Sequence, residues 1–361
     1  MAYYHSSFQR NKRKKSRPFR KFLIVFFILL MIAAGGLGYL AYQAVFSPNV
    51  WIENNEKAYV YINTDDDFED VKKELYSKGL IINRLPFEKL AEYKKYIGNI
   101  KPGRYELTKG MNNNDLINLL RSGEQEPVKV RFNNIRLKED LAERIGEQIN
   151  IDKEEFLELL DDSNYTASIG FTPENVACMF LPNTYFINWN TDTKQFLSRM
   201  KYEYDQFWTE ARKAKAAQHD LSPVEVSILA SIIDKETQQN AEKPRIAGVY
   251  INRLNSGWRL QADPTLVYAM GDFEMKRVLN AYKKIDSPYN TYKYLGLPPG
   301  PICIPSLSSI KAVLNAEDHN YFFFCAQPNY SGYHNFAKHG KQHNINAEKY
   351  REFLNKEGIF K

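Results

Sequence analysis

The order of apolar and polar positions divides the chain into one long apolar run followed by two stretches of shorter, periodic segments. Residues 22–42 carry no charged side chain, and about 20 apolar residues are enough for one helix to cross a bilayer. Beyond this run, apolar positions recur at helical or strand spacing and are interrupted by Gly, Pro and Asn. The pattern predicts an α+β protein with an N-terminal transmembrane helix at residues 22–44.

The first periodic stretch, residues 57–124, is predicted to be a small α+β module. Strand-like runs lie at its beginning and in its second half, and apolar residues at helical spacing predict its helices, the last of which closes at Gly123. The predicted elements are strands at 59–62 and 101–107 and helices at 68–78, 85–97 and 114–120. Residues 45–57 are expected to form a short stalk.

The second periodic stretch, residues 128–361, is predicted to be a larger α+β domain. Its predicted elements are a strand at 128–132, helices at 137–148 and 153–160, a turn at 180–185 and one long amphipathic helix at 191–217. A further helix is expected to begin at Ser222, because Ser222 and Glu225 match a capping box and Pro223 suits the first helical position.

The charge of the chain is unevenly distributed. The formal net charge is +6, but residues 1–21 hold many Lys and Arg and no acid, so the remaining chain is slightly acidic. A slightly acidic body argues against nucleic acid as a partner. Basic residues beside the apolar run predict that residues 1–21 form a cytoplasmic tail and that everything after the helix lies outside the inner (cytoplasmic) membrane.

A cleaved signal peptide is the rival interpretation of the apolar run. We favour an uncleaved, single-pass anchor, because the run is long for a signal peptide and Tyr39, Tyr42 and Gln43 make a poor cleavage site.

The helix that begins at Ser222 ends in the strongest chemical signal of the sequence. Helical spacing places Leu229, Ile232 and Glu236 on one face, so that a carboxyl group ends an apolar stripe. Partial burial and the negative end of the helix dipole both raise the pKa of such a carboxyl group. A Glu that is protonated near neutral pH can act as a general acid. The alternative is an exposed, frayed helix end without chemistry.

Downstream of Glu236, loops fixed by Pro and Gly carry Asn, Gln, Thr and Tyr, which suit the hydroxyl groups of sugars. Ordinary turn chemistry explains any one of these residues equally well. Asp263 has a specific alternative, because it could cap a helix that starts at Pro264 and Thr265. The residues expected to line a cleft are Asn252, Arg253, Gln261, Asp263, Thr265, Tyr289, Asn290 and Thr291.

No metal or cofactor is predicted. His334, His339 and His343 have spacings that match no standard zinc motif. The three cysteines are widely spaced and indicate neither a disulfide framework nor a CxxC site. The sequence also lacks a phosphate-binding Walker loop and a GxSxG nucleophile motif.

Several blocks of the sequence together resemble the MltG (YceG-like) family of endolytic murein transglycosylases. The resemblance extends from the apolar helix to the C-terminus and is strongest over residues 225–345. The matching blocks are ASIIDKET at 230–237, VYINRL at 249–254, LQADPT at 260–265, SPYNTY at 287–292, GLPPGP at 296–301 and HNF at 334–336.

This resemblance implies a function. Glu236 corresponds to the catalytic residue of the family, and Glu242 to an acidic position that would line the cleft. Residues 57–124 would form a LysM-like module that contacts peptidoglycan, and residues 128–361 a YceG-like catalytic domain. The family's enzymes cut the β-1,4 bond between N-acetylmuramic acid (MurNAc) and N-acetylglucosamine (GlcNAc) in nascent glycan strands. They leave 1,6-anhydro-MurNAc ends and thereby limit strand length. Penicillin-binding-protein wall synthases are the implied protein partners.

The chain departs from the family pattern at a few positions. The first acid of the family's E-K-E-T motif is Asp234 here. Asn183, His339 and Gln342 replace an Asp, a Thr and a Glu, and Ser306 stands where the family usually has Gly, so the resemblance assigns these positions no role. Two other functions remain open: a non-catalytic, membrane-anchored peptidoglycan-binding scaffold of the wall-synthesis machinery, and a hydrolytic muramidase. A scaffolding role could also coexist with catalysis.

Overall fold

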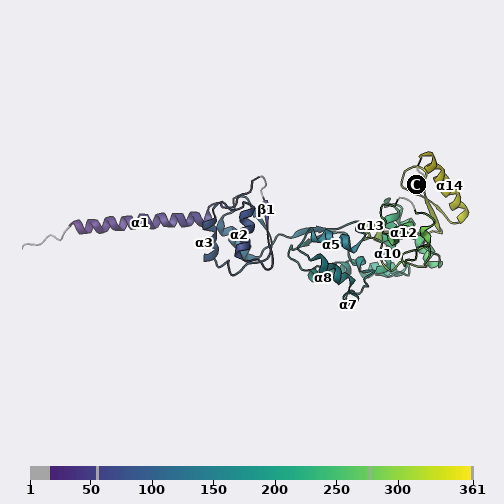
Figure 1. Ribbon diagram of the computed structural model, residues 1–361, viewed down its shortest axis with the longest axis horizontal. Helices are drawn as coiled ribbons and strands as arrows, with labels where there is room; N and C mark the ends of the chain where they lie inside the picture. Colours follow the sequence, from purple (N-terminus) through teal and green to yellow (C-terminus); the bar gives the residue numbers. More distant parts are fainter. Residues whose placement is uncertain (1–16, 54–56, 276–277, 359–361) are drawn as a thin grey trace, which may run out of the picture. The chain divides into compact units, whose positions relative to one another are not determined.

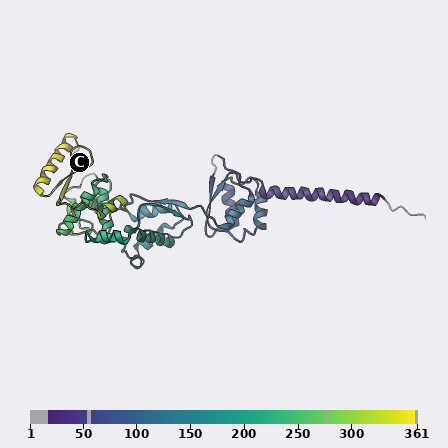
Figure 2. The same cartoon turned by 180° about the vertical axis from the view of Figure 1, so that it is seen from behind.

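The computed structural model describes residues 17–53, 57–275 and 278–358, and the chain forms two compact units, Met1–Glu126 and Pro127–Lys361 (Figure 1; Figure 2 shows the reverse side). Both units mix helices with short antiparallel strand pairs. The predicted α+β class is therefore confirmed. The first part of the predicted cytoplasmic tail, residues 1–16, lies outside the described residues.

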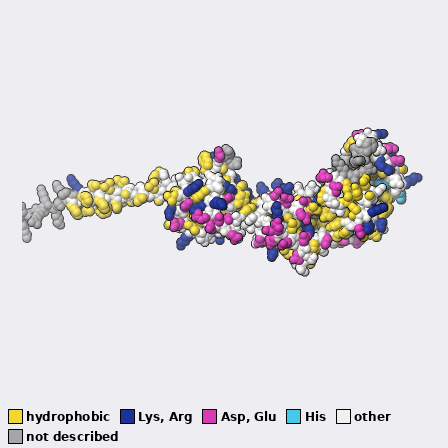
Figure 3. Space-filling view, viewed as in Figure 1, with side chains coloured by type: hydrophobic (Ala, Val, Ile, Leu, Met, Phe, Trp, Pro, Cys, Tyr) yellow, Lys and Arg dark blue, Asp and Glu magenta, His cyan; other side chains and the backbone are white. Residues whose placement is uncertain are grey.

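The first unit begins with the long apolar helix α1. Its segment Phe19–Phe46 has the length and hydropathy of a membrane span, and none of it is buried. Figure 3 shows its hydrophobic side chains along the whole rod. The elements of this unit are α1 (Arg17–Phe46), β1 (Lys57–Ile62), α2 (Phe68–Ser77), α3 (Arg84–Tyr93), β2 (Gly103–Thr108) and α4 (Asn113–Ser122).

The module after α1 follows its sequence signals closely. Strands β1 and β2 pair antiparallel, with Val60 opposite Tyr105, and both of these residues are fully buried. Asp67 caps α2 through a capping box. Gly123 ends α4 with a φ of 80°, a left-handed conformation that favours glycine.

The predicted stalk at residues 45–57 is wrong for its first half. Helix α1 continues to Phe46, and Val50 and Ile52 are buried in the module core. Asn49 is buried too, and its Nδ2 donates to Asn113 Oδ1 at 2.7 Å, while Asn113 Nδ2 donates to the carbonyl oxygen of Ala44 in α1 at 2.8 Å. These bonds fasten the end of α1 to the module. Polar Asn and Pro residues made this segment look like a linker, although its Asn side chains are used inside the fold.

The second unit contains the remaining elements. These are β3 (Val128–Arg131), α5 (Lys138–Gly146), α6 (Lys153–Asp161), α7 (Ser163–Ser168), η1 (Val176–Met179), β4 (Thr184–Ile187), α8 (Thr193–Phe207), α9 (Glu210–Ala217), α10 (Pro223–Glu236), α11 (Lys243–Asn255), α12 (Asp263–Met270), η2 (Tyr282–Lys284), α13 (Leu307–Leu314), β5 (Phe323–Ala326), β6 (His334–Ala337) and α14 (Gly340–Lys356).

The predicted single helix at 191–217 is wrong, because the segment forms two helices. Helix α8 ends where Trp208 leaves helical geometry and buries its indole in the core. Thr209 then caps α9 through a side-chain bond to the N–H of Arg212. The amphipathic spacing continues across this break, so periodicity alone did not reveal it.

Helix α10 is the central helix of the second unit. It packs against α11, α12 and α13, and Figure 1 labels α12 and α13 next to it. The Ser222 capping box is present as predicted. The predicted one-sided apolar stripe is wrong, because every residue from 226 to 233 is buried. Its first turn, residues 223–225, and its last turn, residues 234–236, are partly or fully exposed.

Candidate active site

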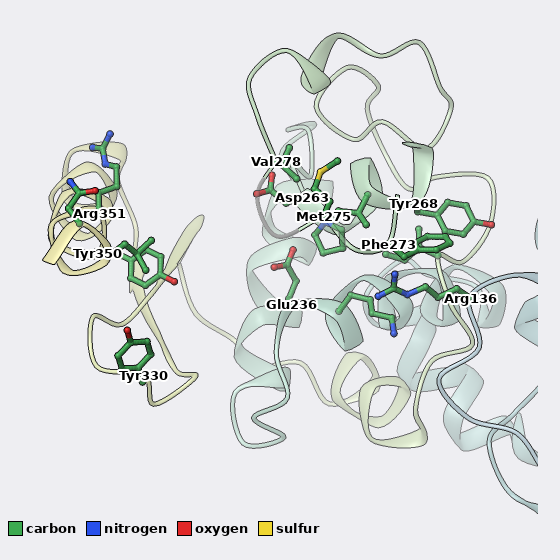
Figure 4. A pocket seen from close by; sticks show the side chains of 16 residues that line it. Arg136, Glu236, Asp263, Tyr268, Phe273, Met275, Val278, Tyr330, Tyr350 and Arg351 are labelled. Carbon is green, nitrogen blue, oxygen red and sulfur yellow. The ribbon is translucent and has the colours of Figure 1, made fainter. Parts of the chain in front are cut away.

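The last turn of α10 borders a cavity of about 850 Å³. Glu236 lies on one side of the cavity, and Asp263 and Tyr268 from α12 lie on another. Tyr330 and Tyr350, from the β5–β6 hairpin and α14, line the far wall. Figure 4 shows Glu236 and Asp263 facing the same space, with Tyr330 and Tyr350 across from them. The cavity is open and aromatic on two sides.

Glu236 is held in place by α11. The hydroxyl group of Tyr250, a fully buried α11 residue, donates to Glu236 Oε1 at 2.5 Å. Burial raises the pKa of Glu236 to about 7; the bond from Tyr250 lowers this pKa, the nearby Asp263 raises it, and Arg253 lowers it. Desolvation outweighs the hydrogen bond, so the carboxyl group is divided between its two protonation states near neutral pH.

Asp263 shares the cavity with Glu236. Its Oδ1 accepts a hydrogen bond of 2.5 Å from the hydroxyl group of Tyr292. Helix α12 starts at Asp263 itself, and Ala262 occupies the N-cap position without a side-chain cap. The alternative that Asp263 caps this helix is therefore wrong, and its carboxylate is available to the cavity.

Four other predicted cleft residues build the loop behind Asp263. The hydroxyl groups of Thr265 and Thr291 are buried and lie 2.8 Å apart. Asn290 is buried as well, and its Nδ2 donates to the carbonyl oxygen of Ile285 at 2.7 Å. Gln261 is exposed, has a φ of 49°, and donates its N–H to the Thr291 carbonyl oxygen. These residues position Asp263 and Tyr292 and do not line the cavity.

Asn252, Arg253 and Glu242 fasten the C-terminal segments to α11. Asn252 Nδ2 donates to the carbonyl oxygens of His319 and Tyr321, and Arg253 Nε donates to that of Phe322 at 2.8 Å. The buried carboxylate of Glu242 accepts from the backbone N–H of His334 and lies 2.9 Å from its Nδ1. None of these three side chains lines the cavity beside Glu236.

Tyr289 lies in a second cavity of about 360 Å³. Its ring centroid is 4.7 Å from that of Tyr268. Arg136 and Tyr268 line both cavities, so the two spaces adjoin along one wall. Tyr289 was predicted to line the cleft; it lines the adjoining cavity and not the cavity beside Glu236.

Asp234 serves a different purpose from Glu236, two residues further on. Asp234 Oδ1 accepts from Lys243 Nζ at 2.9 Å, from Ser306 Oγ at 2.6 Å and from Ser309 Oγ at 2.5 Å. These bonds hold its pKa below the usual range although burial opposes this. The serine at position 306 therefore has a partner in Asp234.

The positions where the family pattern is broken have local roles in the described structure. Asn183 Oδ1 accepts from the N–H of Thr184. His339 is the N-cap residue of α14 without a side-chain cap, and Gln342 Nε2 donates to Asn346 Oδ1. Among the described residues, no group of three His, Cys, Asp or Glu side chains gathers as a metal site. The cysteines described, Cys178, Cys303 and Cys325, are all free thiols.

Sequence reasoning missed Tyr250, Tyr292, Lys235 and Arg136 as residues around Glu236 and Asp263. The two tyrosines lie inside the blocks that carried the resemblance, so their position was a usable signal. Arg136 lies 100 positions upstream in an unremarked loop, and only the tertiary fold brings it to the cavity.

A carboxyl group of raised pKa, facing an open cavity with aromatic walls, defines the class of site that performs general acid–base chemistry. Comparison with known proteins makes the assignment more specific. Residues 60–349 match the model of the YceG-like family. The chain belongs to this family.

Curated relatives carry the name endolytic murein transglycosylase. One from Streptococcus pneumoniae (strain ATCC BAA-255 / R6) is 27% identical over 342 residues, which cover 85% of this chain and 61% of the relative. One from Bacillus subtilis (strain 168) is 28% identical over 316 residues, which cover 83% of this chain and 87% of the relative. The chain thus spans 61% of the length of the pneumococcal relative.

A solved structure shares the fold. The crystal structure of a YceG-like protein from Listeria monocytogenes, at 2.6 Å, is 30% identical in sequence and superposes with a TM-score of 0.54. The match covers 80% of this chain and 98% of the Listeria chain.

Proposed function

We propose that this chain is a lytic transglycosylase that cuts the β-1,4 bond between MurNAc and GlcNAc in nascent glycan strands, leaves 1,6-anhydro-MurNAc ends and so limits strand length. The relatives' shared name supports the substrate class. The observation that carries the proposal is Glu236, whose pKa is raised to about 7 beside the cavity. A group that is half protonated near neutral pH can both donate and accept a proton.

In the proposed mechanism, Glu236 works twice. It first protonates the glycosidic oxygen, so that the bond from this oxygen to C1 of MurNAc breaks and GlcNAc leaves. The 2-acetamido group of MurNAc stabilises the positive charge at C1. The ionised Glu236 then takes the proton from the 6-hydroxyl group of the same sugar, whose oxygen bonds to C1. The 1,6-anhydro ring closes, Glu236 is protonated again, and no water is consumed.

The surroundings of Glu236 support both steps. Tyr250 donates to Oε1, which leaves Oε2 to face the substrate. Asp263 lines the same cavity, and a negative charge there would favour the positive charge that develops at C1. Tyr268 gives the cavity an aromatic wall, and Tyr289 continues this wall into the adjoining cavity. Aromatic side chains offer sugars a large apolar surface next to a polar hydroxyl group.

We also propose the arrangement of the whole chain in the cell. Residues 1–21 would form a cytoplasmic tail and residues 22–44 a single-pass anchor in the inner (cytoplasmic) membrane. Residues 57–124 would form a LysM-like module that contacts peptidoglycan, and residues 128–361 the catalytic domain. The apolar length and exposure of α1 support the anchor. Penicillin-binding-protein wall synthases are the proposed protein partners.

Product analysis tests the proposed reaction. We expect the full chain in detergent to release anhydro-ended fragments from uncross-linked glycan strands, which mass spectrometry finds one water molecule lighter than hydrolysis products. Glu236→Gln should lower the rate by about 10²–10⁴-fold. Glu210→Gln is a matched control, because this side chain is 91% exposed at the start of α9.

Other products would contradict the proposal. Reducing ends without the loss of water would identify a hydrolytic muramidase. Strands that bind but stay intact would identify a non-catalytic scaffold. Wild-type rates in the Glu236→Gln variant would remove Glu236 from the mechanism.

A further inference from the structure

Three basic side chains line the cavity with Glu236: Lys235 and Arg136 on one side, and Arg351 from α14 across the cavity. Lys235 precedes Glu236 in the last turn of α10, and Arg136 comes from the loop between β3 and α5; both line the cavity of about 850 Å³. Both are partly buried. Figure 4 shows Arg136 between Glu236 and the aromatic side chains of Tyr268 and Phe273.

Neither Lys235 nor Arg136 is neutralised by a carboxylate of the described residues. Lys235 Nζ donates to the neutral amide oxygen of Asn134 at 2.6 Å. The Arg136 guanidinium lies 4.6 Å from the ring centroid of Phe273. Asn134 has a φ of 53°, a left-handed conformation that Asn tolerates. Within the loop 134–136, Asn134 therefore binds Lys235, whereas Arg136 lines the cavity.

Two other lysines of this region are paired with carboxylates. Lys243, next to the same helix end, is 5% exposed and forms a 2.9 Å ion pair with Asp234. Lys138, in the adjoining cavity, is paired with Asp161. By contrast, Lys235 and Arg136 line the same cavity, and neither forms an ion pair with a described carboxylate. Two unpaired like charges in one partly buried place disfavour each other, and a bound anion relieves this repulsion.

We propose that Arg136 and Lys235 form a carboxylate-binding subsite, and that its ligand is the acidic peptide carried by the muramoyl sugar that Glu236 acts on. This inference rests on the proposed function. The peptide is attached through the lactyl group at O3 of the sugar whose C1–oxygen bond would be cut. It therefore begins only a few bonds from the C1 atom that would lie beside Glu236. Its free carboxylates match the planar, bidentate donor geometry of Arg136.

The adjoining cavity gives such a peptide a path. Arg136 and Tyr268 line both spaces, so a chain held at Arg136 can continue into the second cavity of about 360 Å³. A phosphate group would also attract two cations, but a phosphate on the 6-hydroxyl group of the muramoyl sugar would block the proposed ring closure. The peptide is therefore the favoured ligand, and phosphate is a competing outcome of the test.

The test compares one set of glycan strands with and without their peptides. The full chain in detergent is given uncross-linked strands that carry acidic stem peptides, or the same strands after an amidase has removed them. We expect the wild type to cut peptide-bearing strands about tenfold faster, which is the effect of one charge-assisted bond. Arg136→Gln and Lys235→Gln should each bring this ratio towards one, and Arg136→Lys should keep part of it.

Lys213→Gln is the matched control, because this cation is paired with Glu210, lines neither cavity and should keep the wild-type ratio. Equal wild-type rates on both substrates would overturn the subsite. If the Arg136→Gln and Lys235→Gln variants lost the same share of their cleavage rate on both substrates, these residues would support the fold and would not bind the peptide. Absence of cleavage on either substrate would instead contradict the proposed function.

A binding measurement separates the subsite from the chemistry. The full-length Glu236→Gln variant is titrated with a fluorescent disaccharide that carries the acidic peptide, and with the same probe after its carboxylates are amidated. We expect the amidated probe, and the added Arg136→Gln substitution, each to weaken binding about tenfold. Equal binding of both probes would overturn the proposal, as would stronger displacement of the peptide probe by inorganic phosphate than by acetate.

Discussion

Glu236 illustrates how neighbouring residues set the pKa of one carboxyl group. Burial raises its pKa to about 7, and Tyr250, Asp263 and Arg253 adjust this value in opposite directions. Tyr250 donates a hydrogen bond and so favours the ionised form, whereas the negative charge of Asp263 disfavours it. Removing the Tyr250 hydroxyl group and removing the Asp263 charge should therefore shift the pKa of Glu236 in opposite directions.

These opposite effects predict the pH dependence of the proposed reaction. Glu236 must start protonated, so activity should fall as pH rises through about 7. Tyr250→Phe removes a bond to the ionised form and should move this alkaline limb to higher pH. Asp263→Asn removes a nearby negative charge and should move it to lower pH. Initial rates of anhydro-end formation between pH 5 and 9 measure both shifts. Shifts in the same direction would contradict this account.

The same pKa predicts how stability changes with pH. The folded-state pKa of Glu236 is raised from 4.5 to about 7, so the folded state binds this proton more tightly than the unfolded chain does. Its contribution to the free energy of unfolding is full below about pH 4.5 and is lost as pH rises to 7. Glu236→Gln should therefore be more stable than the wild type at pH 8, by on the order of 3 kcal/mol, and equally stable at pH 4.

Hydrogen exchange of the most protected α10 amides at the two pH values measures this difference. The Glu210→Gln variant serves again as the control, because its side chain is exposed in both states. A Glu236→Gln variant that is less stable than the wild type at pH 8 would show that the ionised carboxylate is favoured by its site.

At the residue scale, the sequence allowed the chemistry of Glu236 to be predicted but not its partners. Its place at the end of an apolar helix was visible as a local pattern. Thr265, Thr291 and Asn290 belong to the same blocks, yet they are buried among backbone groups. A polar residue in a loop block looks the same in sequence whether it contacts a ligand or holds the loop together, because only tertiary packing separates the two.

At the scale of elements, α10 is a buried helix with a polar end. Its last turn would leave two acids in the interior, and each is satisfied differently: Glu236 by a raised pKa and Tyr250, Asp234 by an ion pair and two serine hydroxyl groups. The Asp234 cluster joins α10 to α11 and to the start of α13. It therefore fixes the direction in which the last turn, and with it Glu236, points.

This cluster predicts a large loss of stability on substitution of Asp234. Asp234→Ala leaves Lys243, which is 5% exposed, without its partner, and such a change costs roughly 3–5 kcal/mol. Denaturant unfolding of the second unit measures this loss. Glu210→Ala breaks an exposed pair with Lys213 and should cost less than about 1 kcal/mol. Replacing both Asp234 and Lys243 by apolar residues should recover most of the loss; no recovery would contradict the ion-pair explanation.

Elements were predictable where local signals are strong. The capping box at Ser222 and the glycine stop at Gly123 were both predicted from the sequence. The break at Trp208 was not, because the choice between continuing a helix and burying an indole depends on the core that receives it. The hairpin β5–β6 and helix α14 were also missed, although α14 supplies one wall of the cavity.

At the scale of the whole molecule, the chain has two separate hydrophobic cores, one before and one after the division between residues 126 and 127. The connection from α1 into the first core runs through Asn49, which is 2% exposed and bonded to both Asn83 and Asn113. Such a buried amide leaves unsatisfied partners when it is removed. The first unit should therefore be sensitive to this residue, and the second should not.

Asn49→Ala tests this independence. We expect the free energy of unfolding of the first unit to fall by about 1–3 kcal/mol, while the second unit is unchanged. Hydrogen exchange of the detergent-solubilised full chain measures both units in one experiment, through the amides of β1 and α10. Asn99→Ala, at an exposed position of the same unit, is the control. Equal destabilisation of α10 would show that the two cores unfold together.

The fastening of α1 to the module has a consequence for the proposed membrane anchor. The candidate span Phe19–Phe46 has 28 residues, including the charged Arg20 and Lys21. At the rise of an α-helix it is about 42 Å long, which exceeds the hydrocarbon thickness of about 30 Å. A helix of this length leans over in a thin bilayer and straightens in a thick one. The hydrogen bonds of Asn49 and Asn113 hold the end of α1 against the module. A change in the tilt of α1 would therefore also change the orientation of the module relative to the bilayer.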